Sequence, residues 1–284
     1  MGTIPFCKFQ GFGNDYIVIE HESIPTELGL GSFARDICRR HEGAGADGIA
    51  VVARAASPNA DFACEIVNPD GSVAGFSGNG TRCVVAYLHY KGLWLDDELR
   101  LETRSGIKNY RLIERRGERE FWFEAEIGKP RFASEDVPVL VETRREHVVN
   151  ESIAINGKYY SFSAVNVGNP AACVFVESFD LDWTSIGAEI ETHGLFPERV
   201  NVVFVKIADR ENLEIRIWER GAGETAASGT CASAAAVLSA FLLKAERSVN
   251  VHSPGGTTKV IWRDDDEMVI TGRADLAYCG TWPI

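Results

Sequence analysis

The chain has 284 residues, 45% of them hydrophobic and 25% charged, which is the composition of a globular protein with a full core. Its formal net charge of -12 excludes a general nucleic-acid binder, which needs a basic face, but a local pocket could still bind a small anion. No apolar run is long enough to cross a bilayer, and residues 1–10 lack signal-peptide features, so no membrane partner is expected.

Seven cysteines are scattered through the chain, an odd number in a protein too large to need disulfides for its stability. We interpret them as reduced and expect a cytoplasmic protein. No cysteine–histidine pair has the spacing of a zinc site, so no metal is expected.

The first half of the chain is predicted to alternate short strands with helices. Helical spacing, with Phe33, Ile37 and Cys38 on one face, predicts a helix over 28–41. Ser105 and Gly106 form a hairpin-turn signal. Apolar–polar alternation and short apolar runs predict strands over 4–9, 16–19, 49–53, 62–67, 98–104, 107–113 and 121–126.

The second half repeats this alternation. A short helix is predicted over 183–192, and Asn156-Gly157 is the clearest hairpin turn in the chain. The predicted strands are 137–141, 152–155, 159–165, 172–176, 201–207, 213–218, 249–252, 258–262, 268–271 and 277–281.

Two short stretches look like copies of one motif, which we call the serine device. In it a serine precedes a glycine at the start of a helix rich in small or apolar residues. They read FSGNGTRC over residues 76–83 and ASGTCAS over residues 227–233. The first N–H groups of a helix have no intrahelical partner and can bind an anion. Ordinary serine N-caps would give the same pattern. The occurrence of one copy in each half favours a single carboxylate held between two facing serines.

Both halves run through several short strands, one buried helix of small residues, and further strands. This shared order predicts an α+β protein built by internal duplication, with two similar domains facing across a cleft. The sequence identity between the halves is weak, so the prediction depends on the element order and the two helix starts.

Seven motifs in one order give the chain a resemblance to diaminopimelate epimerase, a cofactor-independent amino-acid epimerase of lysine and peptidoglycan precursor synthesis. They read GFGNDY (11–16), GADG (45–48), NPDGS (68–72), SGNGTRC (77–83), GNP (168–170), NVVFV (201–205) and ERGAGET (219–225). The resemblance implies two pseudo-symmetric domains, each a β-rich barrel-like sheet wrapped around a central helix. Because the family's last strand returns to the first domain, the expected domains are 1–127 plus 272–284, and 128–271.

The resemblance also implies the chemistry. In the family, two cysteines act on opposite faces of the substrate α-carbon, converting LL- to meso-diaminopimelate without a cofactor. A thiolate removes the α-proton and the opposite thiol returns one, while the helix starts stabilise the developing carbanion. The catalytic positions are Ser77 and Ser228. A homodimer formed through the first domain, with Tyr278 at its interface, is implied as well.

The residues that would bind the amino-acid substrate match the family. Arg220 and the asparagines suit a carboxylate, and Glu219 suits an ammonium group. The implied substrate-binding residues are Asn14, Asn68, Gly78, Asn79, Asn169, Asn201, Glu219, Arg220, Gly229 and Thr230.

The sequence departs from the family at the catalytic positions themselves, because both family cysteines are serines here. Ala171 stands where the family has a histidine, and Cys231 and Ser233 replace the usual glycine and cysteine. A serine hydroxyl is far less acidic than a thiol and needs a neighbouring base to act.

These departures leave several interpretations open. The chain could be a double Cys→Ser variant, a divergent homologue, or an epimerase that uses Cys231 as a displaced thiol. Core packing of Cys231 is the simpler interpretation, and Cys83 is expected to pack as well. An amino-acid epimerase is the leading hypothesis. The alternatives are a binding module without turnover, and a dehydratase or isomerase acting on another small acid.

Overall fold

The computed structural model describes residues 2–75 and 77–284, so Phe76, the first residue of the FSGNGTRC stretch, lies outside the described residues. The chain divides into two compact units. Unit 1 comprises residues 1–125 and 272–284, and unit 2 comprises residues 126–271. The chain passes from unit 1 to unit 2 within strand β7 and returns within strand β16.

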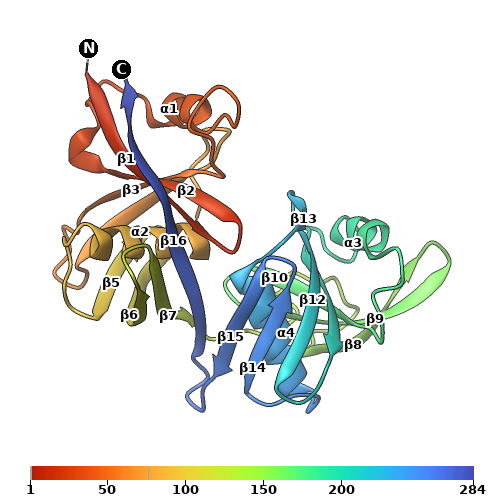
Figure 1. Cartoon of the computed structure of the whole chain (residues 1–284). Coiled ribbons are helices and arrows are strands. Elements are labelled where there is room, and N and C mark those ends of the chain that lie inside the picture. The colour runs from red at the N-terminus through yellow and green to blue at the C-terminus, as the bar shows by residue number, and fades with distance from the viewer. Residues whose placement is uncertain (1, 76) are drawn as a thin grey trace. The chain divides into compact units, whose positions relative to one another are not determined.

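Unit 1 is a closed barrel, because the sheet order β1-β2-β3-β4-β5-β6-β7-β16 ends on a strand that also pairs with β1. The C-terminal part of β16 lies antiparallel to β1, as the family resemblance implies, and Figure 1 shows the two strands side by side. The elements of unit 1 are β1 (Thr3–Gly11), β2 (Asn14–Glu20), η1 (His21–Ser23), α1 (Leu30–Ile37), β3 (Ile49–Arg54), β4 (Phe62–Val67), α2 (Gly78–Tyr90), β5 (Glu98–Thr103), β6 (Gly106–Arg116), β7 (Glu120–Gly128) and the end of β16 (Met268–Pro283).

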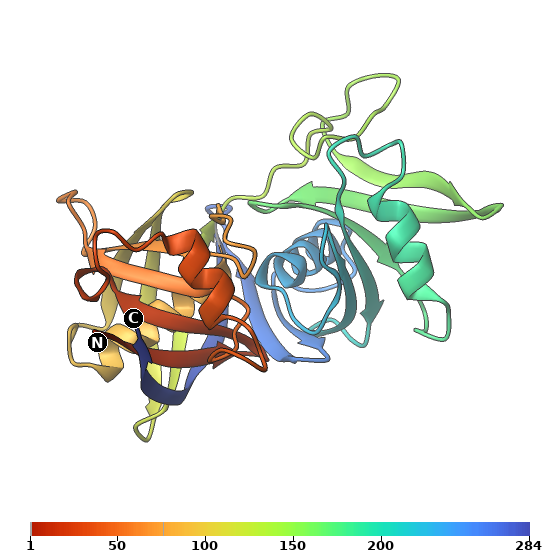
Figure 2. The ribbon, with the colours of Figure 1, turned by 90° about the horizontal axis from the view of Figure 1, so that it is seen from above.

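Unit 2 is a second curved sheet, with the order β16-β15-β14-β12-β11-β10-β9-β8, and Figure 2 shows helix α4 enclosed by it. Its elements are β8 (Val148–Ile155), β9 (Lys158–Asn166), β10 (Pro170–Phe175), α3 (Trp183–Glu191), β11 (Asn201–Ile207), β12 (Asn212–Glu219), β13 (Gly223–Thr225), α4 (Gly229–Phe241), β14 (Ser248–Ser253), β15 (Gly256–Trp262) and the start of β16.

The two units repeat one pattern of strand pairing. From β1 to β7, successive pairs are antiparallel, parallel, antiparallel, parallel, antiparallel and antiparallel. The same series runs through β9, β10, β11, β12, β14, β15 and β16. In both units the buried helix connects the second parallel pair. The α+β class and the pseudo-symmetry predicted from element order are therefore confirmed.

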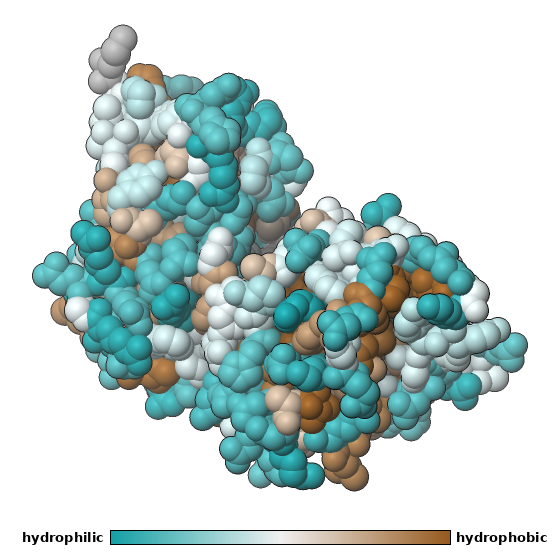
Figure 3. Space-filling view, turned by 45° about the vertical axis from the view of Figure 1, so that its right-hand side comes forward, coloured by the Kyte–Doolittle hydropathy of each residue, from teal (hydrophilic) through white to brown (hydrophobic). Residues whose placement is uncertain are grey.

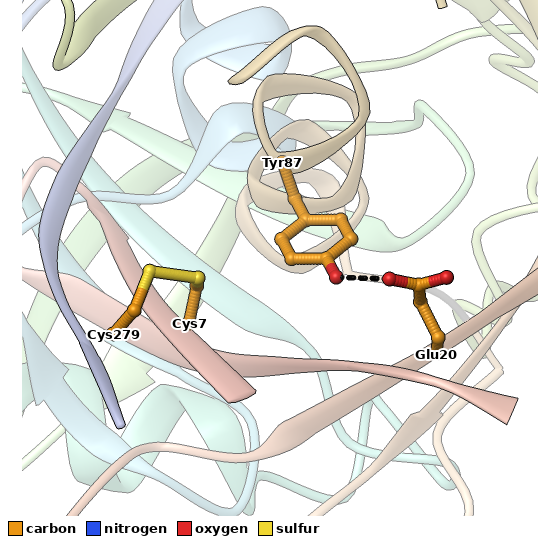
Figure 4. The surroundings of a disulfide bond; sticks show 4 residues. All are labelled: Cys7, Glu20, Tyr87 and Cys279. Carbon is orange, nitrogen blue, oxygen red and sulfur yellow. Dashed lines mark hydrogen bonds between the residues drawn. A yellow bond between two sulfur atoms is a disulfide. The ribbon is translucent and has the colours of Figure 1, made fainter. Parts of the chain in front are cut away.

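Each central helix is enclosed because its side chains are small or apolar almost all round. Helix α2 packs against β1, β2, β3 and β4, and α4 packs against β9, β10, β11, β12, β14 and β15. Residues 80–89 of α2 and 231–240 of α4 are buried. One polar contact fixes α2 in its barrel: the Tyr87 hydroxyl donates to Glu20 Oε1 at 2.6 Å (Figure 4).

The strand predicted over 137–141 is wrong. Val137 and Val139 are buried in the core of unit 2 and Leu140 is exposed, so the alternation that predicted a strand is real. The backbone, however, bonds locally: Val137 and Val139 donate to the carbonyls of Ala133 and Ser134. An irregular loop can thus show the alternation of buried and exposed side chains that is typical of a strand.

Two other boundaries differ from prediction. Helix α1 spans Leu30–Ile37 rather than 28–41, because the chain turns back after Cys38 and Ala46 N–H bonds the Cys38 carbonyl. The strands predicted over 268–271 and 277–281 are one strand, β16. Gly272 interrupts the apolar pattern because a Cβ there would lie 2.7 Å from Arg82 Cζ, a close approach that requires glycine.

The expectation that every cysteine is reduced is also wrong. Cys7 on β1 and Cys279 on β16 are directly opposed, with Cα atoms 4.0 Å apart, and they form a disulfide (Figure 4). The strand register between residues 272 positions apart brings them together, and a single sequence cannot reveal that register. Within the described chain, the remaining cysteines are free and buried: Cys38, Cys64, Cys83, Cys173 and Cys231.

A cluster of charged side chains, which we call the Asp15 cluster, holds β1, β2 and the loop after α1 together. Asp15 is 8% exposed, and its carboxylate binds Lys8 Nζ at 2.7 Å and both terminal nitrogens of Arg40 at 2.9 Å. Arg40 also binds Asp47 at 2.6 Å. Burial raises the pKa of Asp15, but the hydrogen bonds from Arg40 and Lys8 outweigh burial and leave it below its ordinary value.

The face in Figure 3 is largely hydrophilic, with hydrophobic residues gathered mainly in a band on unit 2. None of the described helices is long and apolar enough to cross a membrane.

Cys279→Ser is expected to lower the free energy of unfolding by about 2–5 kcal/mol, because the disulfide restricts the unfolded chain. Denaturant unfolding with and without a reductant measures this. The parent chain should lose stability in reductant, and the variant should not respond. A parent chain that is equally stable in both conditions would contradict the structural role of the bond.

Asp15→Asn is expected to lower the free energy of unfolding by about 3 kcal/mol at neutral pH, because it leaves the largely buried Lys8 ammonium without its carboxylate partner and removes one of the two carboxylates that bind Arg40. A depressed pKa stabilises the fold above the ordinary value of 3.8, and that stabilisation is lost as the pH falls through the lower folded-state pKa. Urea titrations of both chains should therefore converge below pH 3.8. A pH-independent difference would refute this account.

Candidate active site

The first serine device begins helix α2. Ser77 is the N-cap, with extended backbone (φ -139°), and its Oγ accepts the Gly80 N–H at 3.0 Å. The Ser77 carbonyl accepts the Thr81 N–H, as in a regular first turn. Tyr16, on β2, places its hydroxyl 2.8 Å from Ser77 Oγ. Ser77 is therefore an ordinary serine N-cap. It is also one member of a hydroxyl pair with Tyr16.

Two predicted binding residues, Asn14 and Asn79, meet beside this helix start. Asn14 Nδ2 donates to Asp47 at 2.7 Å, and Asn79 Nδ2 donates to Asn14 Oδ1 at 3.3 Å. Arg82 then donates to Asn79 Oδ1 at 2.9 Å. The chain Asp47–Asn14–Asn79–Arg82 fixes which way each amide points.

Arg82 and Asp47 were missed as site residues in the sequence. Arg82 is 2% exposed, and burial lowers the pKa of its guanidinium. An arginine inside an otherwise apolar helix was the available signal, since buried charges need a specific reason. Asp47 sits in a glycine-rich turn, where an aspartate also has ordinary turn chemistry.

The polar contacts of Asn68 lie within its own turn. Its side chain donates to Ser72 Oγ at 3.0 Å, and its backbone N–H donates to the Ser72 carbonyl at 2.8 Å. Residues 68–72 thus form a tight turn, and Gly71 has the positive φ of 84° that such a turn favours.

The second serine device begins helix α4 in the same way but is bonded differently. Ser228 is the N-cap, and its side chain makes no cap hydrogen bond within the described chain. Its Oγ lies 3.3 Å from Thr230 Oγ1 instead. In both devices the leading N–H groups, those of Gly78 and Asn79 and those of Gly229 and Thr230, belong to the helix turn that lacks intrahelical acceptors.

Glu219, the last residue of β12, stands beside Ser228. Thr225 Oγ1 donates to its carboxylate at 2.7 Å. Burial raises the pKa of Glu219, and hydrogen bonds from the Thr225 and Ser228 hydroxyls only partly oppose the rise. A carboxyl group with a raised pKa next to a serine is a stronger base than an ordinary carboxylate and can exchange a proton with the hydroxyl.

Arg220 organises the remaining predicted residues of unit 2. Its backbone N–H donates to Asn201 Oδ1 at 3.0 Å, and its guanidinium donates to Asn169 Oδ1 at 3.2 Å. Asn201 Nδ2 in turn donates to the Pro170 carbonyl at 2.8 Å. Asn169, Asn201 and Arg220 are therefore one connected group, with Arg220 exposed at its edge.

Glu191 was missed in the sequence, because nothing in its helix pattern distinguishes it. It is 6% exposed and accepts the Gly221 N–H and the Trp218 Nε1–H, each at 2.8 Å. Those two bonds fix the loop that carries Arg220.

The structure favours core packing for Cys231. The residue is fully buried, and burial raises its thiol pKa well above the ordinary value, which disfavours the reactive thiolate. Cys83 is likewise buried, and burial raises its pKa to about 12. Ala171 is buried on β10, so no base stands at that place.

Comparison with known proteins agrees with these features. The family model described as diaminopimelate epimerase matches residues 6–132 and 163–277. A diaminopimelate epimerase of Caldanaerobacter subterraneus subsp. tengcongensis is 39% identical over 276 residues, covering 97% of this chain and 98% of the relative. One from Halothermothrix orenii is 37% identical over 280 residues, covering 98% and 97%.

A solved structure shares the fold at low identity. It is a hydroxyproline epimerase from Agrobacterium vitis, with a TM-score of 0.71 and 17% identity, covering 99% of this chain and 92% of that one. The matching family model and the near full-length relatives lead to one conclusion: the chain belongs to the diaminopimelate epimerase family.

Proposed function

We propose that this protein is a cofactor-independent isomerase that interconverts LL- and meso-diaminopimelate by removing and returning the α-proton. The observation that carries the proposal is the repeated device: each unit presents a serine at the start of an enclosed helix, directly before the leading N–H groups. A helix start favours an anion and stabilises charge that develops beside it.

In the proposed reaction the leading N–H groups of a serine-started helix bind the substrate α-carboxylate. Ser77 and Ser228 act on the α-carbon, one removing the proton and the other returning one. Electrons from the broken C–H bond stay on the substrate. The N–H groups at the helix start, which bind its carboxylate, stabilise this negative charge.

Serine chemistry requires a helper, because a hydroxyl is a weak base. Glu219 supports this role on the Ser228 side, since it lies beside that hydroxyl and its pKa is raised. Ionised Glu219 would take the proton that Ser228 relays from the α-carbon. A protonated Glu219 would give it back in the reverse direction.

The distal end of the substrate is proposed to bind the other polar residues. Arg220 with Asn169 and Asn201 suits a second carboxylate, because a guanidinium flanked by amides offers several donors. Asn14, Asn68 and Asn79 would bind the remaining polar groups. The connected hydrogen bonds of both sets support preorganised binding, which limits the ordering cost on association.

We further propose that the two units are the two domains expected from the sequence, and that the protein acts as a homodimer in the cytoplasm. Tyr278 supports an interface on unit 1, because the residue is 42% exposed while its hydroxyl donates to the Ala44 carbonyl at 2.9 Å. In a reducing cytoplasm the exposed Cys279 would leave its disulfide open to exchange with thiols.

Two other functions remain as defined alternatives. The serines and Ala171 favour a binding module that closes on an amino acid without turnover. They are also compatible with a dehydratase or isomerase that acts on another small acid.

Incubation with diaminopimelate in D2O is expected to exchange the α-proton slowly, with loss of its NMR signal. Ser77→Cys/Ser228→Cys should raise the exchange rate by roughly 100-fold or more, because thiols need no helper base. Binding without exchange in either chain would establish the binding module. An oxo-acid product would establish the dehydratase.

Glu219→Gln is expected to abolish the acidic limb of the pH–rate profile of exchange. In the parent chain the rate should rise with pH through an apparent pKa above the ordinary glutamate value of 4.5, because only the ionised carboxylate accepts the proton. Glu224→Gln, a substitution of an exposed residue on the neighbouring strand β13, should keep the parent profile. An acidic limb that survives in Glu219→Gln would remove Glu219 from the mechanism.

A further inference from the structure

The hydroxyl pair formed by Tyr16 and Ser77 has no role in the chemistry described so far. Tyr16 is 6% exposed, and its hydroxyl lies 2.8 Å from Ser77 Oγ. Either oxygen can be the donor in this bond. The two residues come from different elements, β2 and the start of α2, so their contact is a feature of the tertiary fold.

The Tyr16 ring occupies a slot that two glycines keep open. A Cβ at Gly48 would lie 2.8 Å from Tyr16 Cε1, and a Cβ at Gly80 would lie 3.1 Å from the same atom. A Cβ at Gly80 would also lie 3.2 Å from Ser77 Oγ. Glycine at both positions therefore permits the phenol to approach the serine.

The bonding around Ser77 Oγ leaves its proton movable. One lone pair of the oxygen accepts the Gly80 N–H at 3.0 Å, which holds the oxygen in place. The bond with Tyr16 can then run in either direction, so a proton can pass between the two oxygens without movement of either side chain. The positive end of the α2 dipole lies at this same cap and favours negative charge on the pair.

A phenol also supplies part of the acidity that the family's cysteine thiol has and that the serine at position 77 lacks. The unperturbed pKa of a phenol, ~10, lies about 1.5 units above that of a thiol, ~8.5, whereas an aliphatic alcohol is far less acidic than either. Among the groups that contact Ser77, the phenol is thus the chemically competent proton reservoir.

We propose that Tyr16 is a positioning residue that exchanges its proton with Ser77, so that the Ser77–Tyr16 pair replaces a single thiol. This rests on the proposed epimerase function. In the return step the Ser77 O–H bond breaks as the new α-carbon C–H bond forms. The Tyr16 proton moves to Ser77 Oγ, and the negative charge passes from the substrate to the Tyr16 oxygen.

The reverse step uses the same atoms. The Tyr16 phenolate takes the Ser77 proton while Ser77 Oγ takes the α-proton, and the C–H electrons remain on the substrate. No oxidant, reductant or further reactant is needed. Exchange with water resets the protonation of the pair between turnovers.

The test compares Tyr16→Phe in two backgrounds. Phenylalanine keeps the ring in its slot and removes only the hydroxyl. In the parent chain we expect the saturating rate of α-proton exchange from diaminopimelate to fall roughly tenfold or more, with little change in the half-saturating concentration. In the Ser77→Cys background we expect a change within about twofold, since a thiol carries its own dissociable proton.

Tyr110→Phe is the matched control. Tyr110, on β6, is also a buried tyrosine whose hydroxyl bonds helix α2, 2.5 Å from Thr81 Oγ1. Thr81 lies one helical turn beyond Ser77, so this hydroxyl bonds a different residue of the helix. Tyr110→Phe should leave the exchange rate within about twofold. Equal losses of exchange rate for Tyr16→Phe in both backgrounds would show that the tyrosine only packs against the helix start. An unchanged parent rate would overturn the relay alone, and absence of exchange in the parent chain would overturn the relay and the epimerase function together.

Discussion

The structure depends on one constraint: a helix enclosed by its own sheet can present polar chemistry only at its ends. Residues 80–89 of α2 and 231–240 of α4 are buried against strands on several sides. Tyr87 and Arg82 of α2 make their hydrogen bonds inside the fold, whereas His89 Nε2 of α2 and Ser239 Oγ of α4 are buried without a partner in the described chain. The start of the helix is different, because its N–H groups lack partners by geometry. The N–H groups of these two helices that are available to a ligand therefore lie around Ser77 and Ser228.

This constraint explains why so much was predictable from the sequence. A serine before glycine and then a run of small residues is a local signal, and so is the Asn156-Gly157 turn, whose residues have φ values of 51° and 75°. The element order predicted the duplication because each unit repeats its strands and helices in sequence. Local patterns are sufficient wherever the structure is determined by neighbours along the chain.

The errors and omissions share the opposite cause. The Cys7–Cys279 bond and the Tyr16–Ser77 contact depend on strand register and on packing between distant segments. The loop at Val137 and Val139 buries alternate residues without pairing as a strand, so burial period and hydrogen bonding disagree there. The amide chain from Asp47 to Arg82 likewise joins three separate motifs, each of which had an unremarkable local explanation.

The two helix starts are alike in backbone and unlike in their side-chain environments. Ser77 is held by a backbone N–H and a phenol, whereas Ser228 lies beside a threonine and a carboxyl group. A pair of thiols can be chemically equivalent, because each carries its own dissociable proton. Two serine hydroxyls are not chemically equivalent when the groups that exchange protons with them differ in acidity. The duplication has therefore preserved the backbone of the helix start, whereas the side chains that contact the serine differ between the two copies.

The pairing of β1 with β16 has a consequence for how the protein is made. Among the strands of unit 1, β1 is synthesised first and β16 last, so β1 has an unpaired edge until residues 275–283 have emerged. Unit 2 is continuous from residue 126 to 271 and is complete before then. The nascent chain thus contains a finished second unit flanked by an unclosed first one. Its most aggregation-prone interval ends only with the final strand.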